Sequence, residues 1–343
     1  MDFELGPVER SWREKGTALG REVARDPAAA PVVQGAARAG LLDPAVDLLA
    51  VAVAAEAIAE ASPAAAVAYA LHSSIALTLA AGGSASSADA PATRPRADAP
   101  LGRTRPYDAL VRGETVAAVG LSSDEIPVEQ NGRLSGAARW VAPITDRGVA
   151  VVAPQSATER VAYIVALDAP DLRIERVEAA GLAGLVCAHV RFAEVACQPI
   201  GATPPIMTRV RILMAAVGLG IGRRALRAAL TAAKAARTAA AGEQTVQGLL
   251  ADAATDLDAA MLMTWKAASA GALSLADASL AKLMTTSAAQ RAVERATQVI
   301  GADSFERGHL LERLAQDVRA LELFAGRTEA LRAAAAEEML PRA

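Results

Sequence analysis

The spacing of apolar residues changes twice along this 343-residue chain, and that change limits its fold more than any other feature. Residues 1–82 show the spacing of amphipathic helices. From about 107 to 200 the chain consists of short β-rich runs, such as RVAYIVAL, separated by Gly, Pro and Asp. From Arg209 onward helical spacing returns. It is interrupted at Gly242, Gly301–Asp303 and Gly326.

The order of these patterns predicts an α+β protein that is mostly helical. We expect an N-terminal helical domain with a linker at 1–106, a β-barrel-like middle domain at 107–203 and a C-terminal four-helix bundle at 204–343. Alanine is the commonest residue and aromatic residues make up only 3% of the chain, so we expect helices that approach closely through small side chains.

Charge and composition exclude several classes of function. The chain has 35 basic and 38 acidic residues, so it lacks the positive charge that nucleic acid or an anionic membrane attracts. Charged residues and proline interrupt the longest apolar run, 45–82, which predicts buried helices and no membrane span. Cys187 and Cys197 are interpreted as small apolar residues in a reducing compartment. Without a recognisable signal peptide or metal-ligand cluster, we expect a cytoplasmic protein with no metal site.

The most specific motif lies near the C-terminus. Two helical segments flank the polar turn FAGRTE within residues 312–332, after AKLMTTSAAQRAVERATQVIGADSF at 281–305. This arrangement resembles the C-terminal end of the acyl-CoA dehydrogenase family. HVRFAEVACQPIG at 189–201 and RILMAAVGLGIGRRAL at 211–226 resemble the strand and helix by which that family leaves its β-domain. The resemblance covers nearly the whole chain, is weak before residue 120, and implies an acyl-CoA dehydrogenase-like fold.

The same turn lacks the residue that the family uses as a base. There it usually reads Tyr-Glu-Gly-Thr, and the Glu removes the α-proton of an acyl thioester; Ala325 stands in its place. Other members take the base from the position before a helical Arg, which the resemblance places at Arg211, beside the substrate; that position is Val210. Glu322 and Glu329 are weak substitutes, since the first is expected on another helix face and the second to cap a helix start.

The resemblance also implies FAD, bound across a subunit interface and therefore by an oligomer. The implied contacts are Leu121, Ser122, Trp140, Ala142, Arg237, Gln244, Gln298, Gly301, Gly326 and Arg327. Several departures weaken the pattern: Ala142 lacks the family's Thr hydroxyl, and the Phe-Gly after Arg237 is missing. Simpler roles also exist, because Trp140 can be core packing and Gly301 and Gly326 can be helix C-caps.

Three functions fit this pattern. The first is a flavin-dependent oxidoreductase that acts on an acyl thioester of CoA or acyl carrier protein, with a non-standard or partner-supplied base. The second is a catalytically silent subunit, a hetero-oligomer partner of a full-length homologue that carries the Glu. The third is a flavin-free enzyme of specialised metabolism that binds a hydrophobic small molecule. His72, His189 and His309 show no partner spacing and are expected to be packed or surface histidines.

Overall fold

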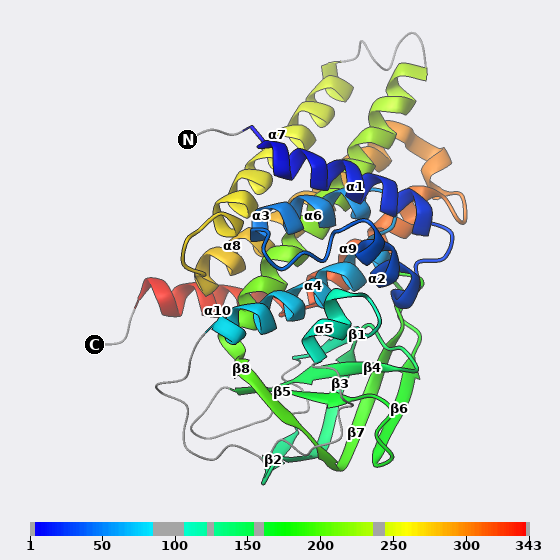
Figure 1. The fold of residues 1–343 in the computed structure, drawn as a ribbon. Helices are drawn as coiled ribbons and strands as arrows, with labels where there is room; N and C mark the ends of the chain where they lie inside the picture. Colours follow the sequence, from blue (N-terminus) through cyan, green and yellow to red (C-terminus); the bar gives the residue numbers. More distant parts are fainter. Residues whose placement is uncertain (1–3, 85–105, 122–126, 154–160, 236–243, 341–343) are drawn as a thin grey trace.

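The computed structural model describes residues 4–84, 106–121, 127–153, 161–235 and 244–340, and Figure 1 shows its helices gathered on one side of a β region. The first helices are α1 (Pro7–Val23), α2 (Ala29–Arg38), α3 (Leu48–Ala59), α4 (Pro63–Ser84) and the short α5 (Pro106–Val111). The Asp47 carboxylate starts α3 by accepting a hydrogen bond from the Ala50 amide at 2.8 Å.

Small residues bring the central helices close together. Helix α3 contacts α1 on one side and α6 (Thr203–Ala235) on the other. On α1, Gly16 faces the main chain of Ala54, and on α6, Gly220 faces the Glu56 carbonyl so closely that a Cβ atom would lie 2.3 Å from its oxygen. An alanine at Gly220 would therefore force the helices apart, which agrees with the close packing expected from composition.

The middle of the chain forms two four-stranded sheets. The strands are β1 (Val116–Gly120), β2 (Val128–Gln130), β3 (Arg133–Val141), β4 (Gly148–Val152), β5 (Val161–Ala166), β6 (Leu172–Val177), β7 (Cys187–Ala196) and β8 (Gln198–Ala202). One sheet has the order β1-β4-β5-β8 and the other β2-β3-β7-β6. Only β1 and β4 pair in parallel among these strands. A bridge between Val119 and Ala142 joins the sheets, and Leu134, Val190 and Phe192 are buried in their shared core.

The C-terminal helices pack against α6 or against one another. They are α7 (Gln244–Ala268), α8 (Leu275–Ile300), α9 (Leu310–Leu323) and α10 (Thr328–Met339), with the 3₁₀ helix η2 (Gly301–Phe305) between α8 and α9. Helices Pro63–Ala81 and Thr203–Ala235 are long and apolar enough to cross a membrane, but 78% and 83% of their apolar windows are buried inside the protein. Their apolar character is therefore accounted for by the core that they form.

The α+β, mostly helical class is confirmed. Strands begin at Val116 and end at Ala202, with helices on both sides in the sequence; the division into three domains stays a prediction. Cys187 and Cys197 are both buried free thiols, and burial raises their pKa values to about 11 and about 12. The linker expected at 83–106 lies outside the described residues, except for residues 83, 84 and 106.

Candidate active site

The turn between α9 and α10 has an unusual backbone. Phe324 is the C-cap of α9 and Arg327 the N-cap of α10, and between them Ala325 and Gly326 have φ angles of +59° and +115°. Alanine has a steric cost in this left-handed region that glycine lacks. The prediction that Gly326 is a helix C-cap is wrong, because α9 ends at Leu323 and Phe324 is its C-cap. Gly301 does cap its helix, α8, with φ +78°.

Two buried cations bind the carbonyls of this turn. From α6, the Arg211 Nε donates to the Ala325 carbonyl at 3.2 Å, and its Nη1 donates to the Ser279 hydroxyl at 2.8 Å. From α8, the Lys282 ammonium donates to the carbonyls of Glu322 at 3.2 Å and Gly326 at 3.0 Å. Both cations therefore contact the turn through its main chain, whichever side chain occupies position 325.

Burial strongly perturbs Lys282. Its side chain is fully buried, and desolvation, followed by the nearby positive charge of Arg211, lowers its pKa to about 7 although the negative charge of Glu322 acts in the opposite direction. Desolvation also lowers the pKa of Arg211, which stays cationic because guanidinium is so basic. The turn is thus held by one permanent positive charge and one that is close to losing its proton at neutral pH.

The residues considered as bases lie in different surroundings. Val210 is buried and apolar. The Glu322 carboxylate accepts hydrogen bonds from Arg319 at 2.7 Å and Thr328 at 3.3 Å. Glu329 is exposed on the first turn of α10, where the helix dipole favours a carboxylate. The role of either glutamate as a base stays a prediction.

A small open pocket adjoins the turn, between α8, α9 and α10. Its lining is mostly polar and includes one cation and one carboxylate. The lining residues are Lys282, Leu283, Thr286, Ser287, Gln290, Glu322, Thr328 and Leu331.

An exposed aromatic pair marks the β region. Trp140, the residue before the last one of β3, has a φ of +55° and is 41% exposed. The His189 ring on β7 meets the indole edge-on, with ring centroids 5.6 Å apart, and its Nδ1 accepts a long hydrogen bond of 3.5 Å from the Trp140 amide. His189 is therefore a packed histidine, one of the two roles expected for it. The antiparallel pairing of Ala138 with Val190, followed by a register shift, brings together residues 49 positions apart.

The other predicted flavin contacts are scattered over several elements. Leu121 is half-buried after β1, and Ala142 is fully buried. Gln244, Gln298 and Arg327 are exposed. Ser122 and Arg237 lie outside the described residues. Their joint role in binding FAD stays a prediction.

The described residues fit a planar ligand with a diphosphate in two respects. Trp140 offers an exposed indole on which a ring system can stack. Gly301 leaves its main chain open, since a Cβ atom there would meet nothing within 4 Å, so no packing contact requires a glycine there. Ala142, by contrast, has no hydroxyl to donate to a ring nitrogen.

The remaining histidines have structural roles. His72 is fully buried; its Nε2 lies 3.1 Å from the Leu110 carbonyl and its Nδ1 accepts from the Ala117 amide at 3.2 Å. Desolvation lowers the pKa of His72 to about 4, so the ring is neutral. His309 caps α9 by accepting from the Leu311 amide. Within the described part of the chain, no group of His, Cys, Asp or Glu is placed to hold a metal ion.

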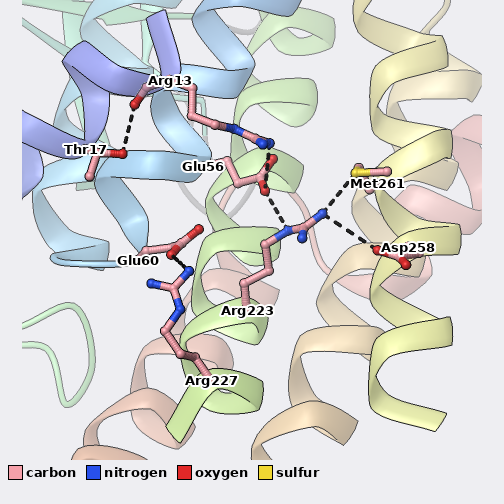
Figure 2. Close-up of polar contacts among 8 residues, drawn as sticks. All are labelled: Arg13, Thr17, Glu56, Glu60, Arg223, Arg227, Asp258 and Met261. Atoms are coloured by element: carbon pink, nitrogen blue, oxygen red, sulfur yellow. Dashed lines mark hydrogen bonds and ion pairs between the residues drawn. The ribbon is translucent and has the colours of Figure 1, made fainter. Parts of the chain in front are cut away.

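A second buried charge cluster lies farther along α6. Glu56 of α3 is 2% exposed and faces two arginines, with Arg223 Nε at 2.6 Å and Arg13 Nη2 at 3.7 Å (Figure 2). The close Arg223 contact is an ion pair whose direction departs from that of a hydrogen bond. Arg223 also reaches α7, where it donates to the Met261 sulfur at 2.9 Å and lies 3.8 Å from Asp258. The cluster thereby ties α1, α3, α6 and α7 together.

Comparisons with known proteins give consistent results. Residues 205–340 match the family described as acyl-CoA dehydrogenase, C-terminal domain. The chain is 32% identical over 197 residues to a 3-sulfinopropanoyl-CoA desulfinase of Paraburkholderia xenovorans, a match that covers 52% of this chain and 50% of that protein. The match thus spans about half the length of this curated relative.

The fold is shared with solved structures along the whole chain. Butyryl-CoA dehydrogenase from Megasphaera elsdenii superposes with a TM-score of 0.81 at 18% identity, covering 99% of this chain and 100% of that chain. A structure described as PigA with FAD and proline gives 0.82 at 19% identity, covering 99% of both chains. The predicted acyl-CoA dehydrogenase-like fold is confirmed.

Proposed function

Since this chain is a member of the acyl-CoA dehydrogenase family by its C-terminal sequence and its fold, we propose that it binds FAD and acts as an oxidoreductase on an acyl thioester. The observation that carries this proposal is the turn itself, which keeps an ordered backbone under Arg211 and Lys282 although Ala325 replaces the base. A cytoplasmic location and assembly into homo- or hetero-oligomers belong to the same proposal.

In this proposal Trp140 stacks against the flavin ring, and the open main chain at Gly301 approaches its diphosphate. Bound FAD supplies the hydride acceptor. Arg211 fixes the Ala325 peptide group beside the substrate. The Ala325 methyl group cannot accept a proton, so the α-proton goes to another carboxylate of this chain or of a partner subunit.

The first test is the visible absorbance of the purified protein before and after addition of FAD. We expect flavin bands that remain with the protein through gel filtration. Trp140→Ala should weaken FAD binding about tenfold, the size expected for loss of one stacking partner, whereas Trp140→Phe should preserve most of it. A protein that stays colourless with excess FAD, alone and with a co-expressed homologue, would refute the proposal.

The second test restores the base. In the FAD-loaded protein, Ala325→Glu should create or raise acyl-CoA oxidation by about tenfold or more, since a positioned general base contributes at least that much. Ala325→Gln is the matched control, with the same size and no base. Equal activity of the two variants would show that the pocket does not present position 325 to an α-carbon.

A second candidate function follows from two observations. Ala325 and Val210 are both apolar, and the relative named 3-sulfinopropanoyl-CoA desulfinase carries a name that denotes removal of a sulfinate group. We propose as this second candidate an enzyme that breaks the bond between an acyl thioester and an anionic group and needs no α-proton base. Water supplies the hydrogen that takes the place of the group, which leaves as sulfite or bicarbonate. Mass spectrometry of the products from carboxylate- or sulfinate-bearing acyl-CoAs separates the two: loss of the anionic group without oxidation supports the second candidate, and a two-hydrogen loss the first.

A further inference from the structure

We propose that Lys282 is a positioning residue of this site, which together with Arg211 fixes the peptide groups of residues 322–326 in the arrangement that presents position 325. The role of these contacts in catalysis rests on the proposed function. The clamp itself is a property of the folded chain and can be tested without flavin or substrate.

The geometry of the clamp is specific. Lys282 spans the turn, because its ammonium binds the Glu322 carbonyl at one end and the Gly326 carbonyl at the other. Arg211 binds the Ala325 carbonyl between them. Glu322 lies in the last turn of α9, where carbonyls normally lack partners, and Ala325 and Gly326 lie in the turn itself. The two side chains therefore satisfy carbonyls that would otherwise need water. With its carbonyls bound in this way, the turn can hold two successive residues at positive φ.

Packing alone does not explain a lysine at this position. The side chain is fully buried beside a second cation, and the Glu322 carboxylate is hydrogen-bonded to Arg319 and Thr328. A methionine would fill a similar volume without the cost of desolvating an ammonium group. The three N–H donors are what distinguish lysine here, and two of them are used on the turn.

The clamp should respond to pH. The charged groups that act on the Lys282 ammonium are Arg211 from α6 and Glu322 from α9, and burial lowers the pKa of Lys282 to about 7. A neutral amine keeps two N–H donors, so both hydrogen bonds survive deprotonation, and the desolvation cost of the buried ammonium is removed. Arg211 stays charged throughout. Opening the turn to water would return the pKa of Lys282 toward its ordinary 10.5, so above about pH 7 the open form binds a proton that the closed form lacks. The turn should therefore become more firmly closed as pH rises through neutrality.

Amide hydrogen exchange of the flavin-free full chain, read by mass spectrometry over peptides covering 320–332, tests the clamp directly. Lys282→Met should speed exchange in the turn about tenfold, since local opening sets the exchange rate. Lys266→Met, at a lysine whose side chain is 64% exposed, is the matched control and should leave the turn unchanged. Equal protection in wild type and Lys282→Met would overturn the proposal.

Two further measurements keep the test decisive. If Lys282→Met does not fold, Lys282→Gln keeps an N–H donor and should give an intermediate rate. In wild type, protection of the turn, corrected for intrinsic exchange, should rise between about pH 6 and 9, and a flat or falling profile would contradict the clamp. The clamp and the proposed function fail separately: a protected turn in a protein that never binds FAD supports the first and refutes the second.

Discussion

Helix α6 carries the buried Arg211 and the partly buried Arg223, and their surroundings differ in sign. Arg223 faces the carboxylate of Glu56, whereas Arg211 shares its site with the ammonium of Lys282. The first site is close to electrically neutral, and the second is positive and satisfied by carbonyl and hydroxyl oxygens. Twelve residues, roughly 18 Å along the helix, separate a cluster that joins helices from one that shapes a turn.

The difference shows what each charge is for. An ion pair in the interior can often be replaced by apolar residues without loss, so the Glu56 cluster is replaceable as a whole but not in part. The Arg211–Lys282 site cannot be treated as a pair, because its two members repel each other. Their stabilising contacts are with the main chain. Removing one of them relieves the repulsion but leaves carbonyls of the turn without a hydrogen-bond donor.

The largest effect should come from breaking the opposite-charge cluster. Glu56→Leu leaves Arg223 without its carboxylate, and we expect the free energy of unfolding to fall by about 3 kcal/mol. Urea unfolding followed by circular dichroism measures it. The double variant Glu56→Leu/Arg223→Leu should recover at least half of the loss. If the free energy of unfolding of Glu56→Leu lies within about 0.5 kcal/mol of wild type, the ion pair makes no measurable contribution to stability.

The like-charge site should give a pH dependence instead. The pKa of Lys282 is about 7 in the folded chain and 10.5 for an ordinary lysine. Between these values the unfolded chain holds a proton that the folded chain lacks, so the free energy of unfolding rises with pH, by at most about 1.4 kcal/mol per unit.

Urea unfolding between about pH 7 and 9 measures this slope, and Lys282→Met should reduce it. The series ends there because the buried Cys187 thiol, with its raised pKa of about 11, contributes a slope of opposite sign at higher pH. The same slope in wild type and variant would mean that another group titrates.

A solvent-exposed ion pair should give the smallest change in the free energy of unfolding. Arg38 and Glu22 form an ion pair at 2.9 Å with side chains that are 64% and 60% exposed. Arg38→Ala should change the free energy of unfolding by less than about 0.5 kcal/mol, because solvent screens the pair. A change as large as that of Glu56→Leu would show that burial does not govern the ranking.

Sequence patterns were sufficient for the fold and for the turn. Helical and strand periodicities are local, and the motif around Ala325 is contiguous, so both can be read without tertiary information. The Trp140–His189 contact depends on a strand register and an irregularity that no local pattern contains. Lys282 was likewise missed as a site residue, since a single lysine in a helix looks like any solvated lysine until the neighbouring elements bury it.

Ala325 has one more consequence, for mutational accessibility. Its φ of +59° is imposed by the turn, and every L-residue other than glycine meets a similar steric cost there. A glutamate would therefore add little backbone strain beyond what alanine already bears, and a single base change converts any alanine codon into a codon for glutamate or aspartate. In contrast, Ala325→Gly would relax the backbone and move away from any catalytic side chain. A single substitution at position 325 would thus place a carboxylate on this turn, whose main-chain conformation is already formed.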